Sequence, residues 1–202
     1  MEEIEAKFLD INPEEIEAKL KEIGAEKKGE YFYKRRIFDY PDLRLHKDAA
    51  WLRLRDEGDK ITLTYKKRLG FSYDPKINDE GMQEIEMIVE DFHKTGIILE
   101  AIGLTEKFYQ ENKRIRYVKD GVEFDLDFWP QIPPYLEIET DSWEKVDEAA
   151  KLLGLDPNSK KICSTTQVYQ LYGIEDIEYQ RMTFKGFVKK VHPHLLEKDG
   201  GK

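Results

Sequence analysis

The sequence predicts an α+β fold in which eight antiparallel strands form a closed barrel and helices pack outside it. Three segments carry helix start and stop signals, and most of the chain between them alternates apolar and polar residues with the period of a strand. In most of these strands the polar positions carry charges of one sign. The predicted strands are 2–9, 30–40, 50–56, 60–68, 82–90, 112–119, 121–128 and 135–140.

Three predicted helices are marked by the residues that begin and end them. Asn12 is a good N-cap, Pro13 suits the first helical position, and Gly24 ends the helix. The third helix begins at Asp141 or Ser142, with Asp141 and Glu144 spaced as in a capping box. The predicted helices span 12–24, 91–103 and 141–154.

Turn residues connect the predicted strands. The Lys-Asp-Gly segment 119–121 and the Asp-Glu-Gly-Asp segment 56–59 are typical of hairpin turns. Segment 70–80 contains glycine, proline and asparagine and predicts a loop.

A tripeptide repeat supports a closed sheet. Glu-Ile-Glu occurs at 3–5, 84–86 and 137–139, and each copy is followed by a helix that ends in glycine. An interval of about 50–80 residues is too long for a solenoid. The repeat therefore favours a pseudo-symmetric closed sheet.

Composition excludes several classes of protein. The 24 aromatic residues argue against a disordered polyelectrolyte, and the net charge of −9 argues against a protein that coats nucleic acid. No apolar run approaches the ~20 residues of a membrane span, and the acidic start does not resemble a secretory signal. The single cysteine, Cys163, precludes an intrachain disulfide. We therefore expect a cytoplasmic protein with no nucleic-acid or membrane partner.

Like-charged pairs on the strands indicate bound ions. Residues i and i+2 of a strand share a face, so neighbouring like charges cost stability unless something binds them. Carboxylate pairs suit a hard divalent cation, and arginine pairs suit phosphate. For any single strand, a merely solvated sheet face is the alternative. The pairs are Glu3/Glu5, Arg53/Arg55, Glu84/Glu86, Arg114/Arg116, Asp125/Asp127 and Glu137/Glu139.

These motifs resemble a known family. Segment 3–7, Glu-Ile-Glu-Ala-Lys, resembles the Glu-x-Glu-x-Lys signature of the CYTH superfamily, the triphosphate tunnel metalloenzymes, and the order of the charged pairs extends the resemblance over about residues 1–172. The superfamily includes class IV adenylyl cyclases, thiamine triphosphatases and inorganic triphosphatases. The resemblance implies an eight-stranded antiparallel tunnel, a small-molecule triphosphate substrate, and Mg²⁺ or Mn²⁺. It implies a CYTH domain over 1–172 and leaves 173–202 as a C-terminal appendage of unread role.

The resemblance also implies roles for individual residues. The implied metal ligands are Glu3, Glu5, Glu137 and Glu139, with Asp125 or Asp127 beside them. The implied phosphate-binding residues are Lys7, Arg53, Arg55, Lys66, Arg114, Arg116 and Lys161. The implied catalytic residues are Glu3, Glu5, Lys7, Arg55 and Lys66, and Glu84 and Glu86 are further tunnel carboxylates. The strand phase of 34–36, Lys-Arg-Arg, cannot be fixed from the sequence.

The expected function is divalent-metal-dependent hydrolysis of inorganic tripolyphosphate, thiamine triphosphate or a nucleoside triphosphate. The charged motifs supply all that this reaction needs. A class IV adenylyl cyclase, which makes cyclic AMP and pyrophosphate from ATP, is an alternative, but it needs a base and ribose pocket that the motifs do not indicate. A non-catalytic polyphosphate- or nucleotide-binding module is a further alternative. The oligomeric state, including a homodimer, stays open.

Overall fold

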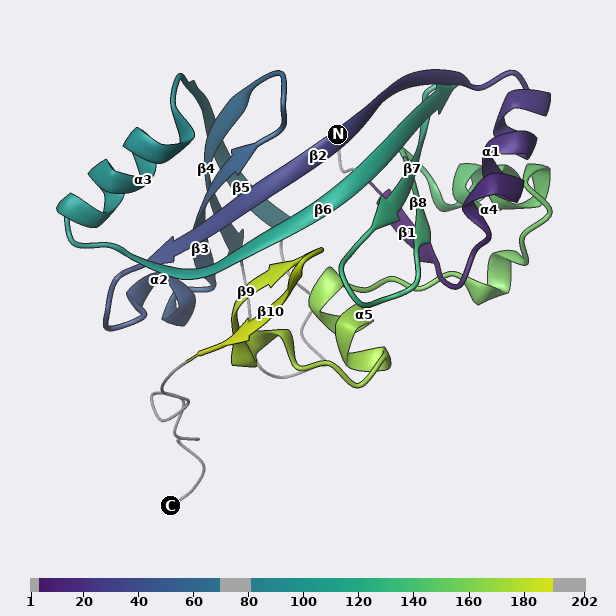
Figure 1. Ribbon diagram of the computed structural model, residues 1–202. Helices are drawn as coiled ribbons and strands as arrows, with labels where there is room; N and C mark the ends of the chain where they lie inside the picture. Colours follow the sequence, from purple (N-terminus) through teal and green to yellow (C-terminus); the bar gives the residue numbers. More distant parts are fainter. Residues whose placement is uncertain (1–3, 70–80, 191–202) are drawn as a thin grey trace. The chain divides into compact units, whose positions relative to one another are not determined.

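The structure, a computed structural model, describes residues 4–69 and 81–190, so Glu3 and the loop expected over 70–80 lie outside the described residues. Its elements are labelled in Figure 1. The strands are β1 (Ile4–Phe8), β2 (Glu26–Asp39), β3 (Ala50–Asp56), β4 (Ile61–Leu69), β5 (Gly81–Val89), β6 (Thr105–Lys119), β7 (Val122–Phe128), β8 (Tyr135–Thr140), β9 (Tyr179–Thr183) and β10 (Gly186–Lys189). The helices are α1 (Pro13–Glu22), α2 (Arg44–Lys47), α3 (Phe92–Ala101), α4 (Trp143–Leu152) and α5 (Thr165–Leu171), with 3₁₀ turns η1 (Pro157–Ser159) and η2 (Asp176–Glu178).

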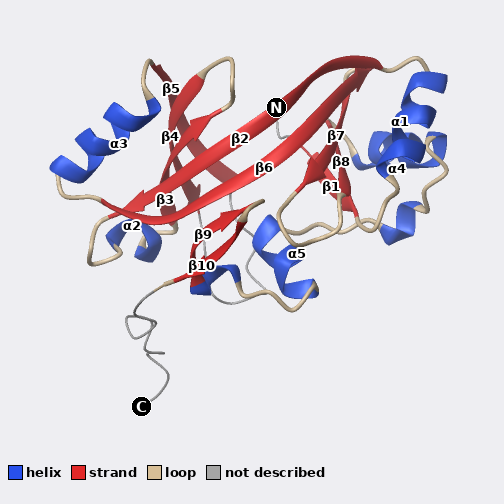
Figure 2. Cartoon of the chain, viewed as in Figure 1, coloured by secondary structure: helices blue, strands red, loops and turns tan. Residues whose placement is uncertain are grey.

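The chain divides into two compact units. The first unit comprises Met1–Tyr33 and Glu111–Ile174, and the second comprises Lys34–Gln110 and Glu175–Lys202. The two longest strands, β2 and β6, are neighbours in the sheet and run side by side in Figure 2. Both begin earlier than the sequence predicts, at Glu26 and Thr105.

All eight predicted strands belong to one sheet, in the order β1-β8-β7-β6-β2-β3-β4-β5. The pairings β1–β8, β8–β7, β7–β6, β2–β3, β3–β4 and β4–β5 are antiparallel. Over residues 4–69 and 81–190, no pairing joins the end strands β1 and β5. The α+β class with an antiparallel sheet and helices on one side is therefore confirmed, whereas closure into a barrel is not.

The core of the first unit lies between its strands and the helices α1 and α4, which are neighbours in Figure 1. Alternate residues of each strand enter this core, because successive side chains of a strand point to opposite faces. Ile16 and Leu20 enter it from α1. The strand residues in it include Ala6, Phe8, Ile115, Tyr117, Phe124, Leu126, Leu136 and Ile138. The opposite face of the same strands is therefore left to the charged residues.

The helix starts follow the sequence prediction, which left Asp141 and Ser142 open at the third helix, but one predicted cap motif does not form. The side chain of Asn12 accepts hydrogen bonds from the backbone N–H groups of Glu14 and Glu15, as expected of an N-cap. At α4, however, the N-cap is Ser142, which accepts from the backbone N–H of Lys145. The capping box predicted from Asp141 was wrong, because that residue precedes the cap by one position. No helix in the described parts of the chain is both long and apolar enough to cross a membrane.

The second unit has its own core, in which α3 packs against the sheet. Phe92 and Leu99 of α3 lie with Phe38, Leu54 and Tyr109 of the strands. Asp91 caps α3 by accepting a hydrogen bond of 2.8 Å from the N–H of Lys94. The charged residues of β3, β4 and β5 alternate with those that face this core.

The C-terminal segment forms a hairpin that the sequence did not predict. Strand β9 pairs with β10, and Tyr179 contacts Phe187 edge to face with ring centroids 4.9 Å apart. β9 also pairs in parallel with β6 at Tyr109 and Gln110, and Met182 is buried there. Residues 179–189 therefore belong to the sheet.

Candidate functional site: two charged sheet faces

Strand register aligns the charged side chains of the first unit. Glu5 lies opposite Glu139 in the β1–β8 pair, and Lys7 lies opposite Glu137. On the other side of β8, Asp125 also lies opposite Glu137. Directly opposed residues share a face. The remaining opposed pairs on this face are Glu123–Glu139, Arg116–Asp125 and Arg114–Asp127.

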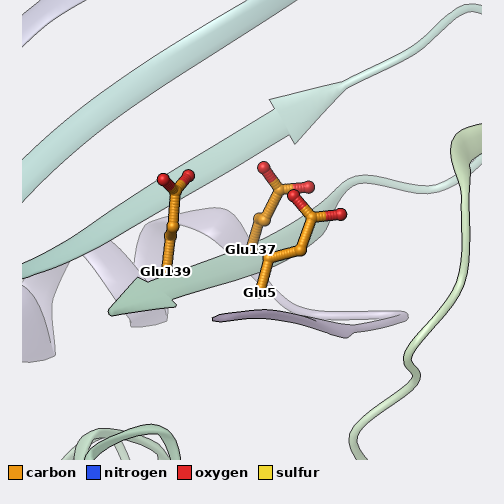
Figure 3. A group of neighbouring side chains, drawn as sticks. All are labelled: Glu5, Glu137 and Glu139. Atoms are coloured by element: carbon orange, nitrogen blue, oxygen red, sulfur yellow. The ribbon is translucent and has the colours of Figure 1, made fainter. Parts of the chain in front are cut away.

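Three carboxylates on this face lie close enough to share a metal ion. One oxygen atom each from Glu5, Glu137 and Glu139 lies within 4.8 Å of the others. Figure 3 shows the three side chains leaving β1 and β8 toward the same side of the strands. Mg²⁺ and Mn²⁺ prefer oxygen ligands, so this carboxylate triad suits either ion. Glu3, the fourth implied ligand on the N-terminal strand, lies outside the described residues.

Lys7 is in direct contact with two members of the triad. Its Nζ lies 2.8 Å from Glu5 Oε1 and 2.8 Å from Glu137 Oε2, and only 3% of its side chain is exposed. Burial disfavours the charged ammonium, but the attraction of Glu137 and Glu5 outweighs it and raises the pKa of Lys7. Lys7 is therefore held as a charged group at neutral pH.

Arg114 binds three carboxylates at once. It donates to Asp127 from Nε and Nη2 at 2.8 and 2.6 Å, to Asp125 at 2.5 Å and to Glu137 Oε1 at 3.0 Å. Burial opposes its charge, but Asp127 outweighs this and raises the pKa of Arg114. Burial likewise opposes the charge of Glu137, and Arg114 and Lys7 together lower the pKa of that carboxyl. Arg114, Lys7 and the carboxylates that they contact thus form a network in which each buried charge has a partner of opposite sign.

Asp125 and Asp127 form ion pairs with arginines. Asp127 is fully buried and also accepts a hydrogen bond of 3.3 Å from Asn112. Arg116 donates two hydrogen bonds to Asp125, at 2.8 and 2.7 Å, and forms an ion pair with Glu123. Neither aspartate belongs to the carboxylate triad. Their roles as metal ligands stay predictions, and their present contacts are with cations.

Lys161 pairs with strand β1 through its backbone. Its N–H and C=O exchange hydrogen bonds of 2.8 and 2.9 Å with Lys7, which forms an isolated antiparallel bridge beside β1. The residue is exposed. Ser164, three residues later, forms a capping box with Gln167 at the start of α5, so its hydroxyl serves the helix.

The second unit carries the remaining cations on β3 and β4. Arg53 lies opposite Thr64, and Arg55 lies opposite Thr62. Lys66 and Thr64 lie opposite Glu84 and Glu86 in the β4–β5 pair. Register therefore places the predicted phosphate-binding and acidic residues of this unit on one face. Lys66 pairs with Glu84 at 2.6 Å, and Thr64 donates to Glu86 at 2.8 Å.

Arg53 is the least compensated of these cations. Its only carboxylate within 4 Å in the described residues is Glu86, at 3.8 Å, and its Nε is buried without a hydrogen-bond partner. Burial and the neighbouring Arg55 lower the pKa of Arg53 to about 10. The guanidinium stays charged at neutral pH, so an anion bound there would offset the cost of its burial.

Sequence reasoning missed three residues on these faces and left the face of a fourth, Arg35, open. Glu57 is buried and accepts two hydrogen bonds from Arg55, at 2.9 and 2.7 Å, and one from Thr62. Arg35 lies opposite Arg55 in the β2–β3 pair and so shares its face. Asn112 and Glu123 complete the set in the first unit. Asn112 lies two residues before Arg114 on β6, and Glu123 lies two residues before Asp125 on β7. Alternate residues of a strand share a face, so this spacing could have identified both.

The family follows from a comparison with known proteins. The model of the CYTH domain family matches residues 1–168, which is most of the chain. The chain belongs to the CYTH family. This confirms the resemblance drawn from the Glu-x-Glu-x-Lys start and the order of charged pairs. No curated protein matches the sequence.

Solved structures of other proteins have a similar fold. A conserved hypothetical protein of Pyrococcus furiosus is 25% identical, with 82% of this chain and 98% of that chain covered and a TM-score of 0.63. A candidate adenylate cyclase of Vibrio parahaemolyticus is 15% identical, with coverage of 84% and 98% and a TM-score of 0.68. A candidate adenylyl cyclase of Hippeastrum, for which a dominant triphosphatase activity is described, is 17% identical, with coverage of 88% and 99% and a TM-score of 0.60.

Proposed function

We propose that this CYTH protein is a divalent-metal-dependent triphosphatase that hydrolyses a small triphosphate substrate. The observation that carries the proposal is the carboxylate triad of Glu5, Glu137 and Glu139, which lies on the same strand face as the charged Lys7. Oxygen ligands for a hard cation beside a buried ammonium suit a metal-bound polyphosphate.

Different side chains of the protein would bind the metal ion and the phosphate groups in such a reaction. A bound Mg²⁺ or Mn²⁺ would supply Lewis-acid charge and a water of lowered pKa. The triad would hold that ion. Arg53, with its incompletely compensated charge, and Lys66 would bind phosphate oxygens and offset the charge that develops on the leaving group. Thr62 and Thr64 lie opposite the two arginines of β3 and would keep their spacing on the sheet.

The proposal includes a tunnel formed by a CYTH domain over 1–172. It rests on the order of charged motifs along the chain and on membership of the family. A cytoplasmic location, which the single Cys163 favours, is part of the same proposal.

A class IV adenylyl cyclase is the second candidate. It is favoured by the similarity of the fold to the candidate cyclase of Vibrio parahaemolyticus. The Hippeastrum protein, with a similar fold and a dominant triphosphatase activity, favours hydrolysis. In a cyclase, the ribose 3′-hydroxyl of ATP would attack and pyrophosphate would leave.

Product analysis separates these candidates. The purified protein with Mg²⁺ or Mn²⁺ is incubated with tripolyphosphate, thiamine triphosphate or ATP, and every product is resolved. Release of phosphate supports the triphosphatase, and cyclic AMP with pyrophosphate supports the cyclase. Tight binding of all three compounds without turnover would contradict both and indicate a binding module.

A further inference from the structure

Lys7 occupies the position between two carboxylates that a metal ion would need. Its ammonium contacts Glu5 Oε1 and Glu137 Oε2 at 2.8 Å each. Both residues belong to the carboxylate triad, whose ligand atoms lie within 4.8 Å of one another. In this state the lysine ammonium contacts two of the three carboxylates, and one of them, Glu137, is also paired with Arg114.

The two oxygens of Glu137 have different partners. Oε1 accepts a hydrogen bond from Arg114 Nη2 at 3.0 Å, and Oε2 contacts Lys7. Arg114 is itself fixed by two parallel hydrogen bonds to the fully buried Asp127. The orientation of the Glu137 carboxylate therefore depends on Arg114, and Oε2 is the oxygen that a second cation can take.

We propose that Lys7 and a divalent metal ion compete for Glu5 and Glu137, so that metal binding displaces the Lys7 side chain and frees its ammonium for the triphosphate. This inference rests on the proposed function. It adds an order of events, in which the metal enters first and the phosphate-binding cation becomes available as a result.

Electrostatics and chain geometry favour an exchange of this kind. An ammonium brings one charge to the triad, whereas a divalent ion brings two and binds carboxylate oxygens directly. The backbone of Lys7 is held by paired hydrogen bonds to Lys161, so only its flexible side chain has to move. A lysine keeps its charge on a mobile four-carbon stem, unlike the planar fork of Arg114.

The competing role and a merely structural role predict opposite results. If Lys7 only holds the carboxylates together, its removal weakens metal binding. If it competes, its removal strengthens metal binding in the absence of triphosphate. The sign of the change therefore decides between them.

The test is titration of the metal-free protein with Mn²⁺, without triphosphate, by the electron paramagnetic resonance signal of free Mn²⁺. Lys7→Met and Lys7→Gln are expected to bind Mn²⁺ at least about fivefold more tightly than the wild type, in the range usual for coupled sites. Lys160→Met is the matched control, because Lys160 forms a similar ion pair at 2.6 Å with Asp147, which is not a member of the triad. Its affinity for Mn²⁺ is expected to equal that of the wild type.

A second measurement uses only the wild-type protein, in case the variants fold poorly. Acetylation of Lys7, read by mass spectrometry against Lys160 in the same sample, is expected to rise when Mn²⁺ is added. Unchanged or weaker Mn²⁺ binding by both Lys7 variants, or unchanged acetylation of Lys7 at saturating Mn²⁺, would overturn the inference. Phosphate release from tripolyphosphate by the wild type would in that case leave the proposed function standing, so the two failures are distinguishable.

Discussion

The guanidinium of Arg36 lies directly over Gly96 of helix α3, where an added Cβ would come within 1.7 Å of Nη1. Arg36 forms ion pairs there with Glu100 at 2.6 Å and with Glu106, and it stacks on Phe38. A glycine inside a helix costs about 1 kcal/mol relative to alanine. At this position the missing side chain of Gly96 allows the guanidinium of Arg36 to lie against the helix backbone.

Gly96→Ala should therefore fail to stabilise the protein despite its better helix propensity. In an Arg36→Ala background the same substitution should raise the free energy of unfolding by roughly 0.5–1 kcal/mol, because only the propensity effect is left. Urea denaturation of the four proteins measures this cycle. Equal effects of Gly96→Ala in both backgrounds would show that the close approach of Arg36 has no energetic weight.

Arg114→Met is expected to lower the free energy of unfolding by about 3–5 kcal/mol, since it leaves the fully buried Asp127 without its cation. Arg114→Lys should recover only part of this loss, because an ammonium cannot donate two parallel hydrogen bonds to Asp127. Chemical denaturation followed by circular dichroism gives both values.

Lys145→Met is the control for Arg114. Its ion pair with Asp141 is exposed, so the free energy of unfolding should hardly change. If Arg114→Met lowered the free energy of unfolding as little as this control does, the buried ion-pair network would not stabilise the fold as expected.

Arg53→Gln should weaken the binding of tripolyphosphate far more than that of phosphate. One charge-assisted contact is worth roughly 1.5–3 kcal/mol, or about one to two decades in affinity. A monophosphate engages fewer of the cations and should lose less. Isothermal titration calorimetry with both ligands provides the comparison.

Arg55 and Arg116 offer a contrast to Arg53. Each already donates two hydrogen bonds to a carboxylate, so substitution by glutamine should cost less tripolyphosphate affinity than Arg53→Gln. Arg44→Gln, on an exposed side chain, is the control. Equal losses for phosphate and tripolyphosphate in Arg53→Gln would mean that Arg53 supplies only diffuse charge.

The buried hydroxyl of Tyr117 predicts a pH effect on stability. It donates a hydrogen bond of 2.7 Å to Glu17, and burial together with this carboxylate raises the pKa of Tyr117. The fold thus favours the neutral phenol. Its contribution is complete below the unfolded pKa near 10 and declines as the pH rises above that value.

Comparison with Tyr117→Phe isolates this contribution. The variant should be less stable by roughly 1.5–3 kcal/mol at pH 8, and the difference should shrink from pH 10 upward. Urea denaturation between pH 8 and 11 tests it, and both proteins keep Lys27, which lies over the ring. A difference that stays constant to pH 11 would argue against a hydroxyl held neutral by the fold.

Local patterns predicted most of the sheet, because the alternation of apolar and polar residues along a strand depends only on which of its faces is buried. The like-charged pairs 114/116 and 125/127 were assigned to one face each, and register sets them opposite one another as ion pairs. Helix starts were predictable to within one residue, as the cap at Ser142 shows. Charge order along the chain was enough to indicate the family.

Non-local features were not predictable from the sequence. The hairpin of β9 and β10 depends on pairing with β6, some 70 residues earlier in the chain. The burial of Glu57 follows from its hydrogen bonds to Arg55 and Thr62, which only the β3–β4 turn brings together. Whether Asp125 contacts a metal or an arginine likewise depends on strand register.

The measurement that tests the central claim most directly is phosphate release from tripolyphosphate as a function of Mn²⁺ concentration. Wild type and Glu144→Gln, an exposed substitution on α4, are expected to show the same metal-dependent rate. Glu139→Gln, which removes one charge from the triad, is expected to lose at least about a hundredfold in rate at limiting Mn²⁺ while its thermal unfolding shows an intact fold. Wild-type turnover by Glu139→Gln, or turnover by the wild type without any divalent metal, would contradict the account.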